Sequence, residues 1–153
     1  MTRRSLPVAA LFALVATAAA AEPIKLDLAD FKLASAFKGG EDLVKYENDT
    51  ISFFTNGTAT AKLTVPADGD YVIVINASCN AALKENAKLT LKVGDKAVKE
   101  NFELTSEDQK EYKFDAKLTK GETTLSVAFT NDAYKENEYD RNLMVHGVRV
   151  EKK

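Results

Sequence analysis

The sequence predicts an all-β protein built as an antiparallel β-sandwich, and three observations carry this prediction. Short runs in which apolar and polar residues alternate recur along the chain, as in strands with one buried face. Turn-forming residues separate these runs at a spacing typical of antiparallel sandwiches. The run at residues 71–78 is nearly all apolar and β-branched, which indicates a central strand buried on both faces.

The strands are expected, in chain order, at residues 24–31, 51–54, 58–65, 71–78, 88–93, 96–98, 111–114, 124–130 and 143–150. In the first of these, Ile24, Leu26 and Leu28 fall on one side, with polar residues between them. Residues 81–88 have room for a single helical turn, and no helix is predicted there.

Turn chemistry between the strands supports this division. Residues 66–70 combine Pro66, which fixes φ, with Gly69, which accepts positive φ. Gly94 and Asp95 indicate a tight hairpin between the runs at 88–93 and 96–98. Gly121 marks another turn before the run at 124–130.

The first residues have the pattern of a targeting segment. Arg3 and Arg4 precede an apolar run at residues 8–20, and three alanines at 19–21 form a small-residue cleavage site. We therefore expect a signal peptide at residues 1–21 and a single exported domain at residues 22–153, periplasmic or extracellular. Residues 2–6 also resemble a twin-arginine signal, although an ordinary general-export signal is the favoured interpretation.

Charge and cysteine content exclude several classes of protein. Without Arg3 and Arg4 the chain holds 19 basic and 23 acidic residues, a net charge of −4. This mild acidity argues against a nucleic-acid partner and against binding to an anionic membrane, and no later run is apolar enough for insertion into one. Cys79 is the only cysteine, so no intrachain disulfide forms, and its place after a core strand favours a buried hydrophobe over a reactive thiol.

The sequence also lacks the usual signs of catalysis. His146 is the only histidine, and its position in a strand favours a structural role. No nucleophile elbow and no glycine-rich phosphate loop is present, and one histidine with one cysteine is too few for a zinc site. A glycosidase carboxylate pair stays as an alternative, weakened because the chain has no tryptophan and its size offers no deep cleft.

The connection between the last two expected strands is the most informative stretch. It holds four carboxylates, Asp132, Glu136, Glu138 and Asp140. Like charges this close repel one another unless a cation lies among them. Oxygen ligands gathered on one loop are what Ca²⁺ requires, although the spacing does not match an EF-hand. The loop therefore predicts a calcium site, with a solvated acidic loop as the alternative.

The flanks of this loop resemble a known family. Residues 128–132 read Ala-Phe-Thr-Asn-Asp and residues 140–145 read Asp-Arg-Asn-Leu-Met-Val. This pattern is similar to the C-terminal signature of the calcium-dependent, xylan-binding type of carbohydrate-binding module. The turn at residues 66–71 and the Lys-Gly-Glu-Thr-Thr-Leu run at 120–125 extend the resemblance over most of the chain. It implies a β-sandwich of the jelly-roll type, usually carried by polysaccharide-degrading enzymes, that binds polysaccharide or oligosaccharide without catalysis.

The resemblance also implies a ligand set. Loop acids and one main-chain carbonyl hold Ca²⁺, which in turn binds vicinal sugar hydroxyls. Carried over by position, Asp132 and Asp140 would be side-chain ligands and Tyr139 would offer its carbonyl. Glu136 or Glu138 could replace either aspartate, because the connection is longer than in typical members. Calcium is thus the implied cofactor, and sugar its implied partner.

The remaining site residues follow from the same resemblance. Asn131 and Asn142 would brace the loop, and Arg141 would pair with a ligand carboxylate. Tyr134 or Tyr139 would stack beside a sugar ring. A second hypothesis is an envelope structural or interaction domain in which the ion only stabilises the loop.

Overall fold

The computed structural model describes residues 21–153, and the expected signal peptide lies outside these residues except for Ala21. The elements are β1 (Ile24–Leu26), η1 (Leu28–Asp30), β2 (Lys32–Ser35), η2 (Glu41–Leu43), β3 (Val44–Glu47), β4 (Thr50–Phe53), β5 (Gly57–Val65), β6 (Gly69–Asn80), β7 (Lys88–Val93), β8 (Lys96–Glu103), β9 (Lys110–Leu118), β10 (Gly121–Phe129), β11 (Tyr134–Lys135), β12 (Tyr139–Asp140) and β13 (Asn142–Lys152). The helical elements are single 3₁₀ turns. None of the helical segments within residues 21–153 has the length and apolarity needed to cross a membrane.

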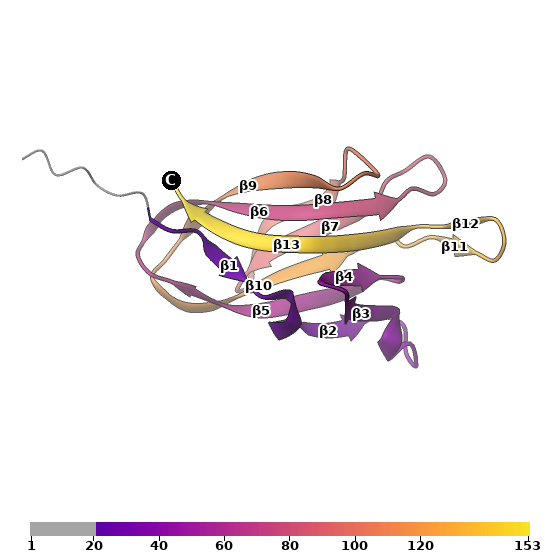
Figure 1. Cartoon of the computed structure of the whole chain (residues 1–153), viewed down its shortest axis with the longest axis horizontal. Coiled ribbons are helices and arrows are strands. Elements are labelled where there is room, and N and C mark those ends of the chain that lie inside the picture. Colours follow the sequence, from indigo (N-terminus) through magenta and orange to yellow (C-terminus); the bar gives the residue numbers. More distant parts are fainter. Residues whose placement is uncertain (1–20) are drawn as a thin grey trace, which may run out of the picture.

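Two antiparallel sheets face each other, and the predicted β-sandwich is confirmed (Figure 1). The larger sheet has the order β3-β4-β13-β6-β9, with β1 added beside β13. The second sheet has the order β2-β5-β10-β7-β8. A small hairpin, β11–β12, projects beyond the sheets at one end.

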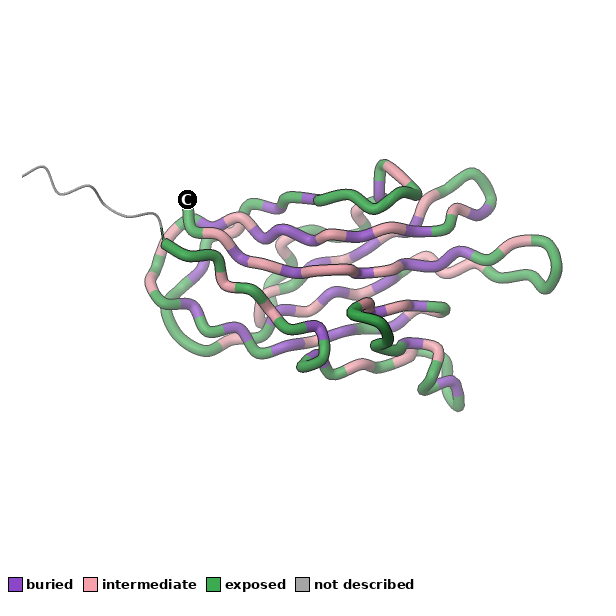
Figure 2. The backbone as a smooth tube through the Cα atoms, viewed as in Figure 1, coloured by how far each residue is buried: buried purple, intermediate pink, exposed green. Residues whose placement is uncertain are grey.

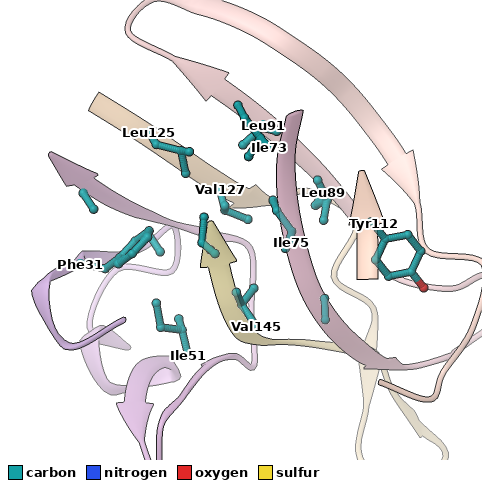
Figure 3. Packing of buried hydrophobic residues seen from close by; sticks show 14 of the residues in the cluster. Phe31, Ile51, Ile73, Ile75, Leu89, Leu91, Tyr112, Leu125, Val127 and Val145 are labelled. Carbon is teal, nitrogen blue, oxygen red and sulfur yellow. The ribbon is translucent and has the colours of Figure 1, made fainter. Parts of the chain in front are cut away.

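One hydrophobic cluster fills the space between the sheets. Buried and exposed residues alternate along most of the strands, as Figure 2 shows, because each sheet packs on one face only. Side chains from both sheets meet in this layer, among them Ile73 and Ile75 from β6 and Leu125 and Val127 from β10 (Figure 3). Cys79 is a buried free thiol, as expected.

The expectation that β6 is buried on both faces is wrong. Its neighbours are β13 and β9, so it is central within its sheet, but a two-layer fold leaves the outer face without a covering layer. Asn76 and Ser78 on that face are half-exposed, and Val74 is the buried residue that breaks the alternation.

The N-terminal third differs most from the expectation. The single strand expected at residues 24–31 is β1 followed by the 3₁₀ turn η1, because the Asp27 side chain accepts a hydrogen bond from the Ala29 N–H at 2.9 Å and caps that turn. β2 and β3 were not expected as strands. Only Val44 of β3 is buried, so that strand carries no hydrophobic periodicity.

Candidate functional site

The β11–β12 hairpin brings the two ends of the acidic loop together. Tyr134 lies opposite Asp140 and Lys135 lies opposite Tyr139 in its register. Asn137 adopts a positive φ of 59° near the tip, and the Glu138 N–H donates to the Lys135 carbonyl at 3.0 Å. The chain therefore reverses between Asp132 and Asp140, and both carboxylates face one cavity.

This cavity has a volume of about 540 Å³. Its acidic side is formed by Asp132 and Asp140, with Tyr134 beside them. Its opposite side comes from a different part of the chain, namely Phe37, Leu43, Phe54 and Thr55. The site thus combines carboxylates from the C-terminal loop with a largely apolar wall from residues 37–55.

Asp132 occupies an unfavourable position for a carboxylate. Burial raises the pKa of its carboxyl, the neighbouring charge of Asp140 raises that pKa further, and a hydrogen bond from Thr55 opposes the rise. Its Oδ1 is buried and finds no hydrogen-bond partner among residues 21–153. An unpaired buried carboxylate oxygen beside a second carboxylate is an arrangement that a cation would stabilise.

These residues fit Ca²⁺ as a pair with room for other ligands. Within the described residues, no group of three His, Cys, Asp or Glu side chains could hold a metal ion. Ca²⁺ takes six to eight oxygens, so an ion held by Asp132 and Asp140 would complete its shell from main-chain carbonyls, water or a hydroxylated ligand. The donor set therefore suits an ion that shares its coordination with a bound molecule.

Arg141 makes several main-chain contacts from a buried position. This side chain is 3% exposed, and its guanidinium donates to the main-chain carbonyls of Glu85, Asn131 and Ala82. Its nearest carboxylate is that of Glu85, at 3.6 Å from Nη2, and not that of Asp132 or Asp140. Arg141 is therefore a buried tie between the 81–86 segment and the base of the hairpin, and the pairing with a ligand carboxylate that the resemblance implies stays a prediction.

The two asparagines have bracing positions. The Asn131 Oδ1 accepts from the Lys88 N–H at 2.6 Å, and its Nδ2 donates to the Asn86 carbonyl at 3.0 Å. Asn142 is 7% exposed, and its Nδ2 lies 3.5 Å from Asn80 Oδ1. Neither residue lines the cavity.

The alternative in which Glu138 binds the metal stays a prediction. In the structure its carboxylate lies 2.6 Å from Lys135 Nζ near the exposed tip of the hairpin. Glu138 and Tyr139 do not line the cavity, whereas Tyr134 does. The carbonyl role implied for Tyr139 stays a prediction.

The apolar wall was not found by sequence reasoning. Phe37 is 61% exposed, Phe54 is 38% exposed and Tyr134 is 65% exposed, so three of the large exposed hydrophobic side chains gather at this cavity. The one available signal is the pair Phe53-Phe54 at the end of β4, since consecutive residues point to opposite faces of a strand and only Phe53 reaches the core. Asn56 joins this wall to the acidic side, because its Oδ1 accepts from the Asp132 N–H at 2.8 Å.

Comparison with known proteins identifies what this arrangement is similar to. A family model described as a Ca-dependent carbohydrate-binding module, xylan-binding, matches residues 72–153. Asp132 and Asp140 fall inside this match, whereas Phe37 and Phe54 lie outside it. No curated protein matches the chain.

Solved structures with the same fold have little sequence in common with this chain. The CBM36-1 domain of a multidomain xylanase from the hindgut metagenome of Trinervitermes trinervoides superimposes with a TM-score of 0.63, at 12% identity over 86% of this chain and 97% of that chain. The mannan binding module from Man5C gives a TM-score of 0.59, at 15% identity over 84% of this chain and 97% of that chain. A family 35 carbohydrate binding module from Clostridium thermocellum gives 0.53, at 14% identity over 87% and 100% respectively. These likenesses show the jelly-roll sandwich fold.

Proposed function

The chain belongs to the family of Ca-dependent, xylan-binding carbohydrate-binding modules, and from this membership we propose that it binds carbohydrate without catalysis through a calcium ion at Asp132 and Asp140. The observation that carries the proposal is the buried, unpartnered Oδ1 of Asp132 beside the Asp140 carboxylate, in a cavity that opens between exposed aromatic side chains.

Each side of the cavity has a role in this proposal. The two carboxylates would hold the ion, which supplies vacant positions for the vicinal hydroxyls of a sugar. Phe37, Phe54 and Tyr134 offer apolar surface to the C–H face of the sugar ring and keep water from that face. Arg141 and Asn131 hold the loop in place through main-chain hydrogen bonds. The loop therefore loses little conformational freedom when a ligand binds, which lowers the entropic cost of binding.

Xylan is the substrate class that the family description names, and we include it in the proposal as the first ligand to test. The mannan-binding neighbour makes mannan oligosaccharides the natural comparison. Both ligands carry vicinal 2,3-hydroxyl pairs, but the 2-hydroxyl of mannose is axial and mannose also has a hydroxymethyl group that xylose lacks. The comparison therefore reports on hydroxyl geometry at the ion together with the room for that group.

Titration calorimetry tests the proposal. We expect Ca²⁺ to bind the metal-free protein, and xylohexaose or mannohexaose to bind the calcium form but not the form held in chelator. Asp132→Asn and Asp140→Asn should each abolish both signals, whereas Glu138→Gln, a matched change on the same loop, should leave them unaltered.

Two results would contradict parts of the proposal. Sugar binding at the loop that persists in chelator would reject the bridging role of the ion. Calcium binding that stabilises the protein, with no sugar bound across a broad glycan panel, would favour the alternative in which the ion only stabilises the loop.

The export of the protein is a separate part of the proposal and rests on the sequence alone. We propose that residues 1–21 are removed as a signal peptide and that residues 22–153 act as one domain in the periplasm or outside the cell. N-terminal sequencing of the protein recovered from a secreting host tests this, with Glu22 as the expected first residue.

A further inference from the structure

The peptide group between Asn131 and Asp132 is held at both of its polar ends. Its carbonyl, that of Asn131, accepts a hydrogen bond from the Arg141 guanidinium. Its N–H, that of Asp132, donates to the Asn56 Oδ1 at 2.8 Å. Arg141 follows the acidic loop, whereas Asn56 lies in the connection between β4 and β5. The main chain of Asp132 is therefore anchored from two distant parts of the chain.

The hydrogen bonds around Asp132 fix its main chain and leave part of its carboxylate free. The carbonyl of the next residue, Ala133, accepts from the Arg141 main-chain N–H at 2.9 Å. The Asp132 Oδ1, by contrast, is buried without a partner among residues 21–153. Such an arrangement sets the position of a ligand oxygen without using that oxygen, which is how supporting residues orient the ligands of a metal.

Asn56 is itself fixed by the strands around it. Its main-chain carbonyl accepts from the Ala36 N–H at 2.8 Å. The next residue, Gly57, is in such close contact with the neighbouring strands that a Cβ there would lie 2.5 Å from the Ala34 carbonyl oxygen and 2.6 Å from Val44 Cγ2. Asn56 therefore holds Asp132 from a part of the sandwich that has no room to shift.

The connection that carries Asn56 also carries part of the apolar wall. The Phe54 N–H donates to the Leu43 carbonyl at 2.8 Å, and both residues line the cavity. Between Phe54 and Asn56, the Thr55 side chain makes a hydrogen bond with the Asp132 carboxyl. Residues 54–56 thus contact the acidic side and the apolar wall together, and they set the position of one relative to the other.

We propose that Asn56 is a positioning residue of the calcium site, whose side-chain oxygen holds the Asp132 main chain so that the carboxylate is in place before the ion binds. This inference rests on the proposed calcium function. A ligand that is held in place beforehand loses less freedom on binding, so the hydrogen bond from Asp132 to Asn56 raises the affinity for the ion. Asn56 lies outside residues 72–153, the part of the chain that the family model matches.

Titration calorimetry with Ca²⁺ alone, on the metal-free protein and its variants, tests this role. We expect Asn56→Ala to bind Ca²⁺ roughly tenfold more weakly than the wild type, because the Asp132 N–H loses its acceptor. Asn56→Asp keeps an acceptor oxygen at the same place, so its calcium affinity should equal or exceed that of the wild type. Chemical denaturation of each variant confirms that the proteins being compared are folded.

Asp68→Ala is a matched control for the loss of a long-range hydrogen bond. The Asp68 Oδ1 accepts from the Lys120 N–H at 2.7 Å, so a side-chain oxygen again holds a main-chain N–H of a distant segment. This bond lies beyond the Val65–Gly121 end of the β5–β10 pair, whereas Asn56 lies at the Gly57–Phe129 end. Asp68→Ala should therefore lower stability but leave the calcium affinity unchanged.

Hydrogen exchange of the Asp132 amide, followed by NMR in chelator, reports on the proposed bond itself. We expect slow exchange in the wild type and in Asn56→Asp, and roughly tenfold faster exchange in Asn56→Ala. This measurement separates the effect of the hydrogen bond from that of the negative charge that Asn56→Asp adds. Restored calcium affinity in Asn56→Asp with a fast-exchanging Asp132 amide would assign the recovery to charge and overturn the inference.

Three calorimetric results would also overturn it. They are equal calcium affinity in Asn56→Ala and the wild type, an Asn56→Asp protein that binds as weakly as Asn56→Ala, and an equal loss of affinity in Asp68→Ala. Failure of the proposed function is distinguishable from these results, because it would appear in the wild-type protein as the absence of calcium binding, and it would remove the role of Asn56 with it.

Discussion

At the scale of single residues, the acidic loop holds carboxylates in opposite environments. Glu138 is exposed and neutralised by Lys135 at 2.6 Å. Asp132 has a buried, unpartnered oxygen, and burial together with the charge of Asp140 raises the pKa of its carboxyl. A solvated acidic loop would leave its carboxylates exposed, so Asp132 is the residue whose position calls for a cation.

Asp132→Asn is expected to stabilise the metal-free protein, by on the order of 1 kcal/mol, because it removes a buried charge that repels Asp140. The pKa of Asp132 is raised in the folded state, so its contribution to stability is fully present below the unfolded pKa and is lost as pH rises through the folded pKa. The gain from the substitution should therefore appear at neutral pH and vanish in acid. Thermal unfolding in chelator from acid to neutral pH measures it, and Glu138→Gln, which has no such repulsion to relieve, is the control.

His146 predicts a second pH dependence, of opposite sign. Burial lowers the pKa of its imidazole from the ordinary value of 6.5, so the unfolded chain takes up a proton before the folded protein does. The stability that it contributes is present above pH 6.5 and is lost as pH falls toward the folded pKa. The charged groups that line the cavity beside His146 are Lys25, Arg149, Asp27 and Asp49.

We expect the melting temperature of the wild type to fall by a few degrees more than that of His146→Gln between pH 7 and pH 5. Glutamine keeps a hydrogen-bonding side chain near Ser78 and Thr50 but does not titrate. Parallel pH curves for the two proteins would contradict the assignment of this pH dependence to His146.

At the scale of elements, the β11–β12 hairpin depends on a support that the acidic motif does not reveal. Arg141 joins the carbonyls of Ala82, Glu85 and Asn131 from a buried position. Two loops distant in sequence are thus locked together beneath the carboxylates. The positions of the two carboxylates in the proposed metal site therefore depend on these Arg141 hydrogen bonds.

Arg141→Ala is expected to lower the free energy of unfolding by about 3 kcal/mol, because buried carbonyls lose their donor and the Glu85 carboxylate keeps only Lys88 as a partner. Arg141→Lys should recover only part of this loss, since an ammonium group cannot reproduce the planar fork. Chemical denaturation measures both changes. Calcium affinity should fall with stability in this series; unaltered affinity in a destabilised protein would show that the tie does not position the ligands.

A comparison of the expected strands with the observed ones shows how far the sequence could predict the fold. Turn residues and period-two runs located β5, β6, β7 and β10, and Gly94 adopts the positive φ of 56° that its hairpin required. β2 and β3 were missed because they are short and largely exposed, so they carry little apolar alternation.

Only the part of the site that lies on one loop was predictable from the sequence. Asp132 and Asp140 lie on one loop, where spacing and family resemblance could find them. Phe37 and Phe54 reach the same cavity through contacts between segments distant in the chain, such as the Asn56–Asp132 hydrogen bond. No local sequence pattern encodes such contacts. The burial of Arg141 could not be predicted either, because its sequence neighbourhood is that of an exposed charged residue in a loop.

At the scale of the whole molecule, the proposed calcium ligands Asp132 and Asp140 are attached to the ends of core strands. Asp132 follows β10, whose Leu125, Val127 and Phe129 are buried, and Asp140 precedes β13, whose Leu143 and Val145 are buried. These strands belong to different sheets that share one hydrophobic cluster. An ion between the carboxylates would therefore join the two layers of the sandwich and oppose its global unfolding.

Calcium at about 100 times its dissociation constant is expected to stabilise the protein by about 2.7 kcal/mol, which raises the melting temperature of a domain of this size by several degrees. A bound oligosaccharide should raise it further only when calcium is present, because the sugar shares the coordination of the ion. Differential scanning calorimetry with calcium, sugar, both and chelator measures the coupling directly. A single transition that shifts as a whole would show that the ion acts on the entire sandwich. A small separate transition that alone responds to calcium would instead confine its effect to the hairpin, and additive shifts from calcium and sugar would mean that the two bind independently.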